Sequence, residues 1–276
     1  MNQQHFFRPS SLGHADIDYA DTTSILTKAS GFMESYDYTL NPYSGCSFGC
    51  TYCYAAFFAR DSQKQNDWGK WVLVKENAVS KLEKMRKPPR DKSIYMGSVT
   101  DPYQPIERKL ELVRGILKVL IKYQPRLVIQ TRGPLATRDI DLFKQFETIQ
   151  INMTVTTDDE DIRRHFEPWC PANEQRLNAI ETINRAGIPS AITMTPLLPL
   201  KDPVSFAKKL KQTGIRNFVV QPFHASKGKF VRGTRTEALQ ILKSHDWTQQ
   251  RYQDCVATLR QYLPSLLEGK AGFESI

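Results

Sequence analysis

The segment CSFGCTYC, from Cys46 to Cys53, places three cysteines on one short stretch of the 276-residue chain. Thiolates are the usual ligands of iron–sulfur clusters, and three thiolates on a short loop can hold three irons of a cubane cluster. Gly45 and Gly49 allow the backbone to wrap closely around such a cluster. The segment therefore predicts a 4Fe–4S cluster on Cys46, Cys50 and Cys53, whose fourth iron has no protein ligand in this loop.

Two other interpretations of the cysteines remain open, a zinc site and three buried thiols without metal. A structural zinc ion normally takes four protein ligands, and no fourth cysteine or paired histidine lies near the motif. The chain has five cysteines, whereas a disulfide framework would predict an even number and a secreted protein. The opening residues, MNQQHFFRPS, lack the pattern of a secretory signal, and no segment is apolar enough to span a bilayer. These features predict a cytoplasmic protein that contacts no membrane.

The composition is that of a globular protein, with 40% hydrophobic and 24% charged residues. The formal net charge of +9 suits an anionic partner such as nucleic acid, and an ordinary basic surface is the competing interpretation. The segment KGKFVRGTR, residues 227–235, is the better candidate for a nucleic-acid contact. Phe230 lies among its cations and can stack on a base.

Outside the cysteine motif, strand-like and helix-like segments alternate along the chain. Apolar runs such as LVI in residues 126–131 are typical of strands buried on both faces of a parallel sheet. Strands are predicted at residues 36–40, 93–97, 126–131, 149–156, 190–195 and 217–221, and helices at 107–122, 138–146, 160–166, 173–186, 203–212 and 236–263, the last with a break near 244–246. This alternation predicts an α/β fold with a parallel sheet, either a partial barrel or a doubly wound sheet. In both, ligands gather at the C-terminal ends of the strands.

The cysteine spacing, with Tyr52 before the last cysteine, resembles the motif of the radical S-adenosylmethionine (SAM) superfamily. Further segments together resemble its spore photoproduct lyase-like branch: CTYCY at 50–54, SVTD at 98–101, EP at 167–168 with Arg176, GIP at 187–189 and PLLP at 196–199. The resemblance covers residues 41–235. It implies a partial (β/α)6 barrel of the radical SAM type, with parallel strands and outer helices.

The resemblance also implies the chemistry. The open iron of the 4Fe–4S cluster would bind the amino and carboxylate groups of SAM. One electron would then cleave SAM to methionine and a 5′-deoxyadenosyl radical, which abstracts hydrogen from the substrate. A reductant such as flavodoxin or ferredoxin would supply the electron. The chain is accordingly divided into an N-terminal extension (1–35), a radical SAM partial barrel (36–235) and a C-terminal helical segment (236–276).

Polar residues follow the predicted strands, where SAM is expected to bind. Ser98, Thr100 and Asp101 offer groups for the SAM ammonium, although Thr-Asp-Pro is also a good helix start. The family has a basic residue near Arg132 that pairs with the SAM carboxylate, and a guanidinium can do so through two parallel hydrogen bonds. Thr154 and Thr156 end the next predicted strand, where the branch has a hydroxyl near the SAM ribose, and β-branched strand composition is the competing explanation for both. The expected cofactor-binding residues are Tyr52, Ser98, Thr100, Asp101, Arg132 and Thr154, and His224 is a weaker candidate for a substrate contact.

One feature departs from the spore photoproduct lyase-like branch. Those lyases return a hydrogen atom to the product radical from a cysteine between the cluster motif and the middle of the barrel. This chain has no cysteine between Cys53 and Cys170, which argues against thymine-dimer repair. Tyr54, Tyr103 and Cys170 are the weak candidates for catalytic hydrogen-atom transfer, since buried tyrosines and lone cysteines more often serve packing.

The sequence thus predicts a monomeric radical SAM enzyme whose substrate is unassigned, with nucleic acid as one option. The first alternative is an iron–sulfur electron-transfer protein without SAM chemistry. The polar groups at the strand ends disfavour it, because an electron carrier needs no polar pocket there. The second alternative is a nucleic-acid-binding protein in which the cluster only stabilises the fold. The charge permits it, but the sequence resembles no recognised nucleic-acid-binding motif.

Overall fold

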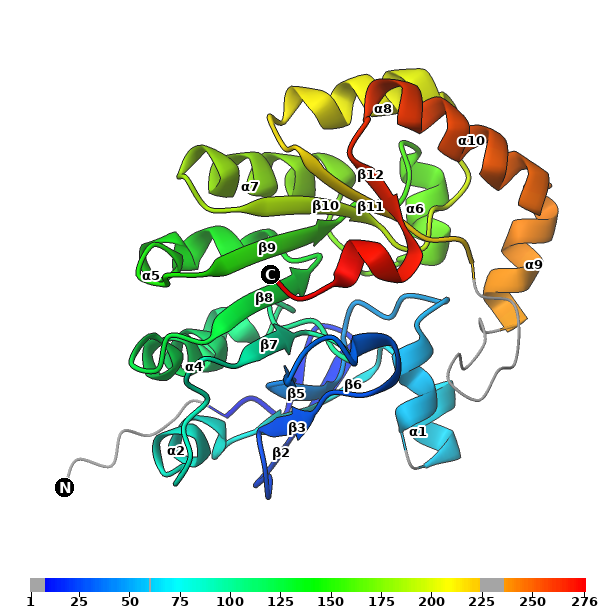
Figure 1. Cartoon of the computed structure of the whole chain (residues 1–276). Coiled ribbons are helices and arrows are strands. Elements are labelled where there is room, and N and C mark those ends of the chain that lie inside the picture. Colours follow the sequence, from blue (N-terminus) through cyan, green and yellow to red (C-terminus); the bar gives the residue numbers. More distant parts are fainter. Residues whose placement is uncertain (1–7, 60, 224–235) are drawn as a thin grey trace.

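The structure is a computed structural model that describes residues 8–59, 61–223 and 236–276 (Figure 1). In that part of the chain the main sheet has eight strands, in the order β12-β11-β10-β9-β8-β7-β4-β3. All neighbouring strands are parallel except β3 and β4. The strands are β3 (Leu26–Lys28), β4 (Tyr38–Leu40), β7 (Ser93–Met96), β8 (Arg126–Thr131), β9 (Ile149–Thr154), β10 (Ser190–Met194), β11 (Asn217–Val220) and β12 (Leu266–Glu268). The predicted α/β fold with a parallel sheet is confirmed, and all six predicted strands are present.

The two faces of the main sheet carry different side chains, because successive residues of a strand point to opposite sides. One set is apolar and packs with the helices in the main core; it includes Ile94, Met96, Leu127, Ile129, Ile151, Met153, Ile192, Met194 and Val220. The alternate set faces inward. It contains Tyr95, Val128 and Val219 together with polar residues such as Gln130 and Thr154. The inner face is therefore the polar one, which suits a site that binds a polar ligand.

Most of the helices cover the apolar face of the main sheet (Figure 1). Helix α4 shows why they pack there, since its buried residues Val113, Ile116, Leu117 and Leu120 recur at helical spacing. The longer helices are α4 (Leu112–Ile121), α7 (Asn173–Arg185), α8 (Pro203–Gln212), α9 (Thr236–Ser244) and α10 (Gln249–Tyr262), and the shorter ones are α1 (Ser62–Asn66), α2 (Ala78–Glu83), α3 (Glu107–Leu110), α5 (Ile140–Phe143) and α6 (Glu160–Phe166). The predicted break in the last helical segment is confirmed between α9 and α10.

Two helix predictions need correction. The helix predicted at residues 107–122 is divided into α3 and α4 at Glu111, whose φ is +49°. The buried Glu107 carboxylate accepts a hydrogen bond from the Val113 backbone amide at 3.0 Å. It thus caps an amide in the first turn of α4, and α4 starts as a separate helix. The helix predicted at 138–146 begins earlier, as the 3-10 turn η3 (Pro134–Asp139), and ends with α5.

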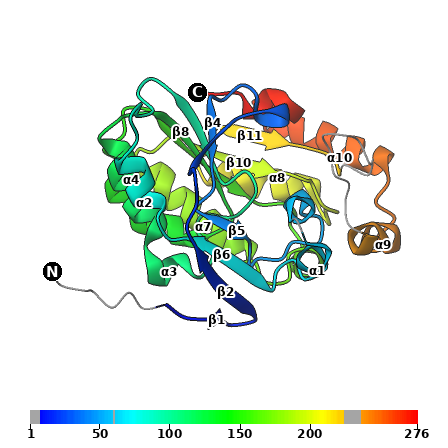
Figure 2. The ribbon, with the colours of Figure 1, turned by 90° about the horizontal axis from the view of Figure 1, so that it is seen from below.

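A second sheet, absent from the sequence-based expectation, has the strand order β1-β2-β6-β5. Its strands are β1 (Ser11–Leu12), β2 (Ala15–Ala20), β5 (Tyr43–Gly45) and β6 (Trp71–Lys75). Strands β2 and β6 are parallel and lie side by side in Figure 2. The sheet holds the start of the cysteine loop, residues 46–53, because β5 ends at Gly45.

The C-terminal segment closes the inner face of the main sheet. Strand β12 pairs in parallel with β11, and the 3-10 turn η4 (Gly269–Phe273) follows it. Phe273 packs with Tyr36, Tyr95, Val128 and Val219. The segment is thus part of the folded body (Figure 1). None of the helices in the described part of the chain combines the length and apolar character needed to cross a membrane.

Candidate functional site

The cysteine loop begins where β5 ends. Cys46 and Cys50 are buried and Cys53 is half-buried. All five cysteines, each within the described residues, are thiols and not disulfides. The loop turns sharply, since the Gly49 amide donates to the Cys46 carbonyl at 3.2 Å and the Cys53 amide to the Cys50 carbonyl at 3.1 Å. The loop therefore presents three thiols from two consecutive turns.

The donor set of this loop fits an iron–sulfur cluster better than a single metal ion. Within residues 8–59, 61–223 and 236–276, no three His, Cys, Asp or Glu side chains are grouped to hold one ion. In a cubane cluster each thiolate binds a separate iron, so its ligands need not converge on one point. Cysteine thiolates are also the usual protein ligands of such clusters.

The segment that follows β7 holds the cysteine loop in place. The Thr100 hydroxyl donates to the Gly45 carbonyl at 2.5 Å. The Ser47 backbone amide donates to the side-chain carbonyl of Gln104 at 2.9 Å. Both contacts are buried. Thr100, predicted to bind the cofactor, thus also fixes the position of the loop.

Ser98 lies at the same junction. Its hydroxyl accepts a hydrogen bond from the Asn41 amide at 3.0 Å, and the Val99 backbone amide donates to the other end of Asn41 at 3.0 Å. The Ser98 carbonyl accepts a hydrogen bond from the Tyr54 hydroxyl. The end of β4, the end of β7 and the residue after Cys53 are therefore joined at Ser98. Tyr54, a candidate for hydrogen-atom transfer, is 46% exposed.

Asp101 joins the end of β7 to the end of β8. One oxygen of its buried carboxylate accepts from the Thr131 hydroxyl at 2.6 Å and from the Tyr103 amide at 2.9 Å. The other oxygen accepts from the Arg132 amide at 2.6 Å. Burial raises the pKa of Asp101, and these hydrogen bonds oppose that rise. The carboxylate thus sets the backbone position from which Arg132 projects.

Arg132, Tyr52 and Glu167 form the charged centre of the site. Arg132 Nη2 donates to the Tyr52 hydroxyl at 3.1 Å, and the Tyr52 hydroxyl donates to Glu167 Oε1. Thr156 also donates to Glu167 Oε1, at 2.9 Å, and Arg176 pairs with Oε2 at 2.5 Å. Glu167 is fully buried. Burial alone would raise its pKa, but Arg176 and Arg132 outweigh that effect and lower it to about 2.

These partners do not accept a hydrogen bond from every nitrogen of the Arg132 guanidinium. Its Nε lies 3.6 Å from Glu167 Oε1, and it has no hydrogen-bond partner in the part of the chain that the structure describes. The Arg132 side chain is 19% exposed. The buried Nε thus faces the Glu167 carboxylate, while part of the Arg132 side chain stays accessible.

Cys170 lies against the cysteine loop. Its sulfur is 3.6 Å from the sulfur of Cys50 and 3.9 Å from the carbonyl oxygen of Phe48. The hydrogen bond from Cys170 lowers the pKa of the Cys50 thiol, whereas burial raises the pKa of the Cys46 thiol. A residue 120 positions away in sequence from Cys50 is thus in contact with it.

Thr154 and Tyr103 lie in other networks. The Thr154 hydroxyl accepts from Gln130 Nε2 at 2.6 Å and lies 3.0 Å from the Thr193 hydroxyl, both on the inner face of the sheet. The buried Tyr103 hydroxyl donates to Asp139 at 3.1 Å, in an ion network that also contains Arg138. Tyr103 is therefore tied to η3 and not to the cysteine loop. His224 and residues 227–235 lie outside the described residues.

Neither Glu167 nor Arg176 received a site role from the sequence. Thr156 was considered with Thr154 for the SAM ribose, and in the structure its hydroxyl donates to Glu167. The segment EP and Arg176 served only to indicate a family branch. A signal was present, because Glu167 precedes α7, a helix that packs on the sheet, and Arg176 lies within that helix nine residues later. Their ion pair, and the hydrogen bond that Tyr52 donates to Glu167, depend on the fold and are not visible in the sequence.

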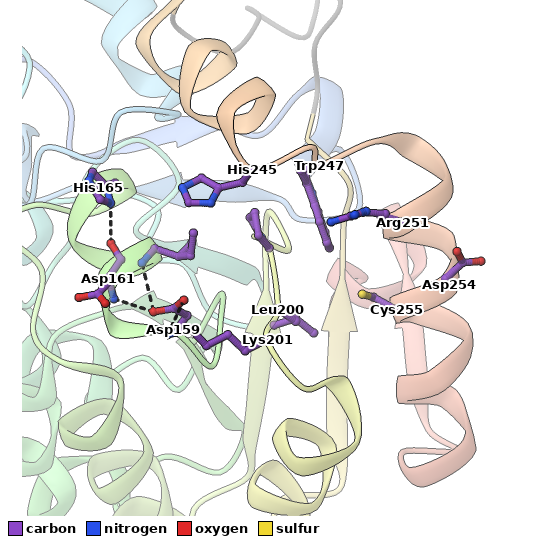
Figure 3. A pocket seen from close by; sticks show the side chains of 12 residues that line it. Asp159, Asp161, His165, Leu200, Lys201, His245, Trp247, Arg251, Asp254 and Cys255 are labelled. Atoms are coloured by element: carbon purple, nitrogen blue, oxygen red, sulfur yellow. Dashed lines mark hydrogen bonds and ion pairs between the residues drawn. The ribbon is translucent and has the colours of Figure 1, made fainter.

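A pocket elsewhere does not include the predicted site residues. It lies beside α6, between the segment after β10 and the start of α10, and Figure 3 shows His165 and His245 on one side of it. Their ring centroids are 6.4 Å apart. Its cations are paired, Lys201 with Asp159 at 2.9 Å and Arg251 with Asp246 at 3.1 Å. Neither cation is therefore left unpaired to attract an anionic ligand.

Comparison with known proteins identifies the chemistry that this arrangement resembles. The family model of the Radical SAM superfamily matches residues 40–220. An uncharacterized protein of Methanocaldococcus jannaschii is 38% identical over 162 residues, 59% of this chain and 61% of the relative. An uncharacterized protein of Mycobacterium tuberculosis is 32% identical over 171 residues, 59% of this chain and 50% of the relative. The matches thus span between half and three-fifths of these relatives.

Solved structures share the fold. A variant of spore photoproduct lyase superposes with a TM-score of 0.63 and 13% identity over 91% of this chain and 81% of its own. Another variant, with bound AdoMet and dinucleoside spore photoproduct, gives a TM-score of 0.62 over the same shares at 12% identity. SuiB of Streptococcus suis, bound to S-adenosylmethionine, gives 0.50 at 12% identity, over 84% of this chain and 49% of its own. At such identities the likeness establishes a common fold.

Proposed function

The chain belongs to the radical SAM superfamily, and we propose that it holds a 4Fe–4S cluster on Cys46, Cys50 and Cys53 and uses it to cleave SAM reductively. When bound, the cluster supplies the electron that divides SAM into methionine and a 5′-deoxyadenosyl radical. The observation that carries this proposal is the cysteine loop itself. Its three thiols lie on a loop held by the segment after β7, near the buried Tyr52 and Glu167 and the partly exposed Arg132, at the C-terminal edge of the parallel sheet. Ligands of such sheets bind at that edge.

Arg132 is the residue that we assign to the SAM carboxylate. Its Nε lacks a hydrogen-bond partner among the described residues, and its side chain is partly accessible. Glu167 is already paired with Arg176 and hydrogen-bonded by Tyr52, so a second anion can use the remaining capacity of Arg132. A guanidinium binds a carboxylate with two parallel hydrogen bonds.

The other proposed cofactor residues differ in how many hydrogen bonds their side chains can still form with a ligand. Asp101 accepts three hydrogen bonds within the protein, which supports a role in positioning Arg132 alongside any contact with the SAM ammonium. Thr100 supports the loop. The Ser98 hydroxyl has one hydrogen-bond partner and the Thr154 hydroxyl has two. A hydroxyl can both donate and accept, so each can form a further hydrogen bond. We assign Ser98 to the ammonium and Thr154 to the ribose of SAM.

The test is anaerobic reconstitution with iron and sulfide, followed by SAM and dithionite. The parent should bind about four iron per chain and absorb broadly near 400 nm, as thiolate-bound cubanes do, and it should release 5′-deoxyadenosine. Replacing any of Cys46, Cys50 or Cys53 by alanine should abolish both, whereas Cys255→Ala should change neither. Stoichiometric zinc without iron would contradict the proposal. A cluster that never cleaves SAM would favour the electron-transfer alternative.

The role of Arg132 can be separated from that of the cluster. Arg132→Ala should retain the iron content and the 400 nm absorption of the parent but lose SAM cleavage, because the carboxylate contact is removed. Arg108→Ala, a change of the exposed basic residue in α3, is the matched control and should cleave SAM as the parent does. Parent-like cleavage by Arg132→Ala with an intact cluster would show that Arg132 has no part in it.

We propose a substrate that contains nucleic acid or nucleotides, on different grounds. The net charge is +9, and a solved spore photoproduct lyase with the same fold holds a dinucleoside substrate. Replacing Lys227, Lys229, Arg232 and Arg235 together by alanine should weaken DNA or RNA binding and flatten its dependence on salt, because each phosphate contact releases counterions. If the parent binds neither DNA nor RNA detectably, or binds them independently of salt, the proposal of a nucleic-acid substrate is wrong.

Repair of thymine dimers is not the reaction that we propose. No cysteine lies between Cys53 and Cys170, so the lyase-type return of a hydrogen atom would need another donor, such as Tyr54, Tyr103 or Cys170. Clean and rapid repair of spore photoproduct would contradict this view. We further propose that the enzyme works in the cytoplasm as a monomer and receives electrons from a flavodoxin or ferredoxin.

A further inference from the structure

Cys170 is a buried thiol whose position is fixed by its backbone. Its amide donates to the Glu167 carbonyl at 3.1 Å, and its carbonyl accepts from Arg163 Nη1 at 2.9 Å. Arg163 Nη1 also donates to the Glu167 carbonyl at 3.0 Å. The segment between Glu167 and Cys170 is thus held in one conformation. Its thiol is 7% exposed and points at the cysteine loop.

Two acceptors lie within reach of this thiol. The sulfur of Cys50 is 3.6 Å from the Cys170 sulfur, and the Phe48 carbonyl oxygen is 3.9 Å away. Between two protonated thiols either sulfur can donate. A thiolate that binds iron has no proton, so only Cys170 can then be the donor. Binding of a cluster by Cys50 would therefore fix the direction of this contact.

We infer that Cys170 tunes the cluster by donating an S–H hydrogen bond to the Cys50 sulfur, which raises the reduction potential of the cluster. This inference rests on the proposed function, because it needs a cluster on Cys50. Reduction adds negative charge that is shared by the ligand sulfurs. A donor aimed at one of them stabilises the reduced state more than the oxidised state, and hydrogen bonds to sulfur are among the factors that set the potential of such clusters.

Other roles of Cys170 predict different behaviour. A fourth thiolate ligand would occupy the iron that is left for SAM, and its loss would lower the amount of bound cluster. A hydrogen-atom donor to the substrate radical would affect turnover with substrate but not the potential measured without it. A packing residue would affect stability alone. The potential of the loaded cluster, measured without SAM or substrate, therefore distinguishes the tuning role from the rest.

The experiment compares the reconstituted parent with Cys170→Ala, Cys170→Ser and Cys255→Ala. Cys255 is half-buried in α10 and controls for the loss of a thiol elsewhere. Iron and sulfide are quantified first, and each midpoint potential is then measured by a redox titration followed by electron paramagnetic resonance. We expect full loading throughout. The potential of Cys170→Ala should shift below that of the parent, whereas Cys170→Ser, which keeps a donor, should lie closer to the parent, and Cys255→Ala should equal it.

The outcomes separate this inference from the proposed function. If the parent takes up no cluster, the proposed function itself fails. If all variants load and Cys170→Ala has the potential of the parent, the tuning role is wrong while the function stands. Loss of iron from Cys170→Ala, with or without loss from Cys170→Ser, would make Cys170 a ligand or a scaffold for the cluster. A donor that only tunes the potential does not hold the metal, so that result would also overturn the inference.

Discussion

At the scale of single residues, Glu167 connects most of the charged groups of the site. It is fully buried, pairs with Arg176 at 2.5 Å and accepts hydrogen bonds from Tyr52 and Thr156. Arg132 is the second cation near it. Removing one partner of a buried ion pair leaves a charge uncompensated, which is much more costly than losing an exposed pair. Glu167 is thus a structural requirement for the position of both arginines.

Glu167→Gln should therefore lower the free energy of unfolding of the cluster-free protein by roughly 3–5 kcal/mol at pH 7. Its folded pKa of about 2 lies below the ordinary glutamate value of 4.5, so its stabilising effect is complete above pH 4.5 and is lost as the pH falls toward 2. Urea denaturation should show the gap between parent and Glu167→Gln narrowing over that range. Glu174→Gln, which removes an exposed pair with Lys209, should cost at most about 1 kcal/mol. Equal effects of the two changes would contradict this account of Glu167.

At the scale of elements, the cysteine loop depends on a close approach that only glycine permits. Gly49 has a φ of +58°, and a Cβ there would lie 2.4 Å from the Trp169 ring. Trp169 stacks on His14 with ring centroids 3.8 Å apart, and His14 hydrogen-bonds to the Ser47 carbonyl at 3.0 Å. The turn between β1 and β2, the loop and the segment after α6 are packed together there. A side chain at Gly49 would displace all three.

Gly49→Ala should therefore lose most of the iron that the parent binds after reconstitution. The matched control is Gly187→Ala, because Gly187 also has a positive φ, +86°, but a Cβ there meets nothing within 4 Å. The control should lose only about 1–2 kcal/mol of stability, from the strain of the left-handed conformation, and bind iron as the parent does. Iron content by colorimetric assay and stability by urea denaturation check both. Full iron in Gly49→Ala would mean that the loop tolerates the displacement.

The same scale shows what the sequence could predict. The six central strands and α6, α7 and α8 were predictable because apolar runs and helical spacing reflect burial within each segment. The second sheet was not, because β1 and β5 have only two and three residues and β2 pairs with β6, which lies more than 50 residues away. The break at Glu111 was missed because it depends on Glu107 reaching Val113.

The candidate site divides in the same way. The three cysteines could be named from their spacing. Arg132 could be named from its place after a strand together with the family resemblance, and Tyr52 from that resemblance alone. The partner of Cys50 could not be named, because Cys170 is brought to it by the fold across 120 positions. Sequence proximity predicts ligands on one loop, whereas contacts between loops require the register of the sheet.

At the scale of the whole molecule, the inner face of the sheet is closed by the end of the chain. Phe273 is buried and packs edge-on against Tyr95, at a centroid distance of 6.4 Å, and against Phe32, at 5.5 Å. The Tyr36 hydroxyl donates to the Glu274 carbonyl at 3.1 Å. These contacts join the last residues to segments near both the first and the middle strands. The C-terminal segment therefore contributes to the stability of the whole sheet.

Phe273→Ala should lower the free energy of unfolding by about 3–5 kcal/mol, as large buried aromatic side chains do when truncated. Leu267→Ala is the control in the neighbouring β12, because Leu267 is 49% exposed and its truncation should cost within about 0.5 kcal/mol. Both values follow from urea denaturation of the cluster-free protein. A Phe273→Ala value as small as that of Leu267→Ala would show that the segment packs only loosely.

The pairing of β12 with β11 also has a consequence for biosynthesis. β11 ends at Val220 and β12 begins at Leu266, so one edge of β11 stays open on the nascent chain until the ribosome has added the residues between them. At about 5–20 residues per second this takes several seconds. An open strand edge can pair with other chains. Translation of residues 221–268 is therefore the interval in which a chaperone would do most to keep newly made molecules apart.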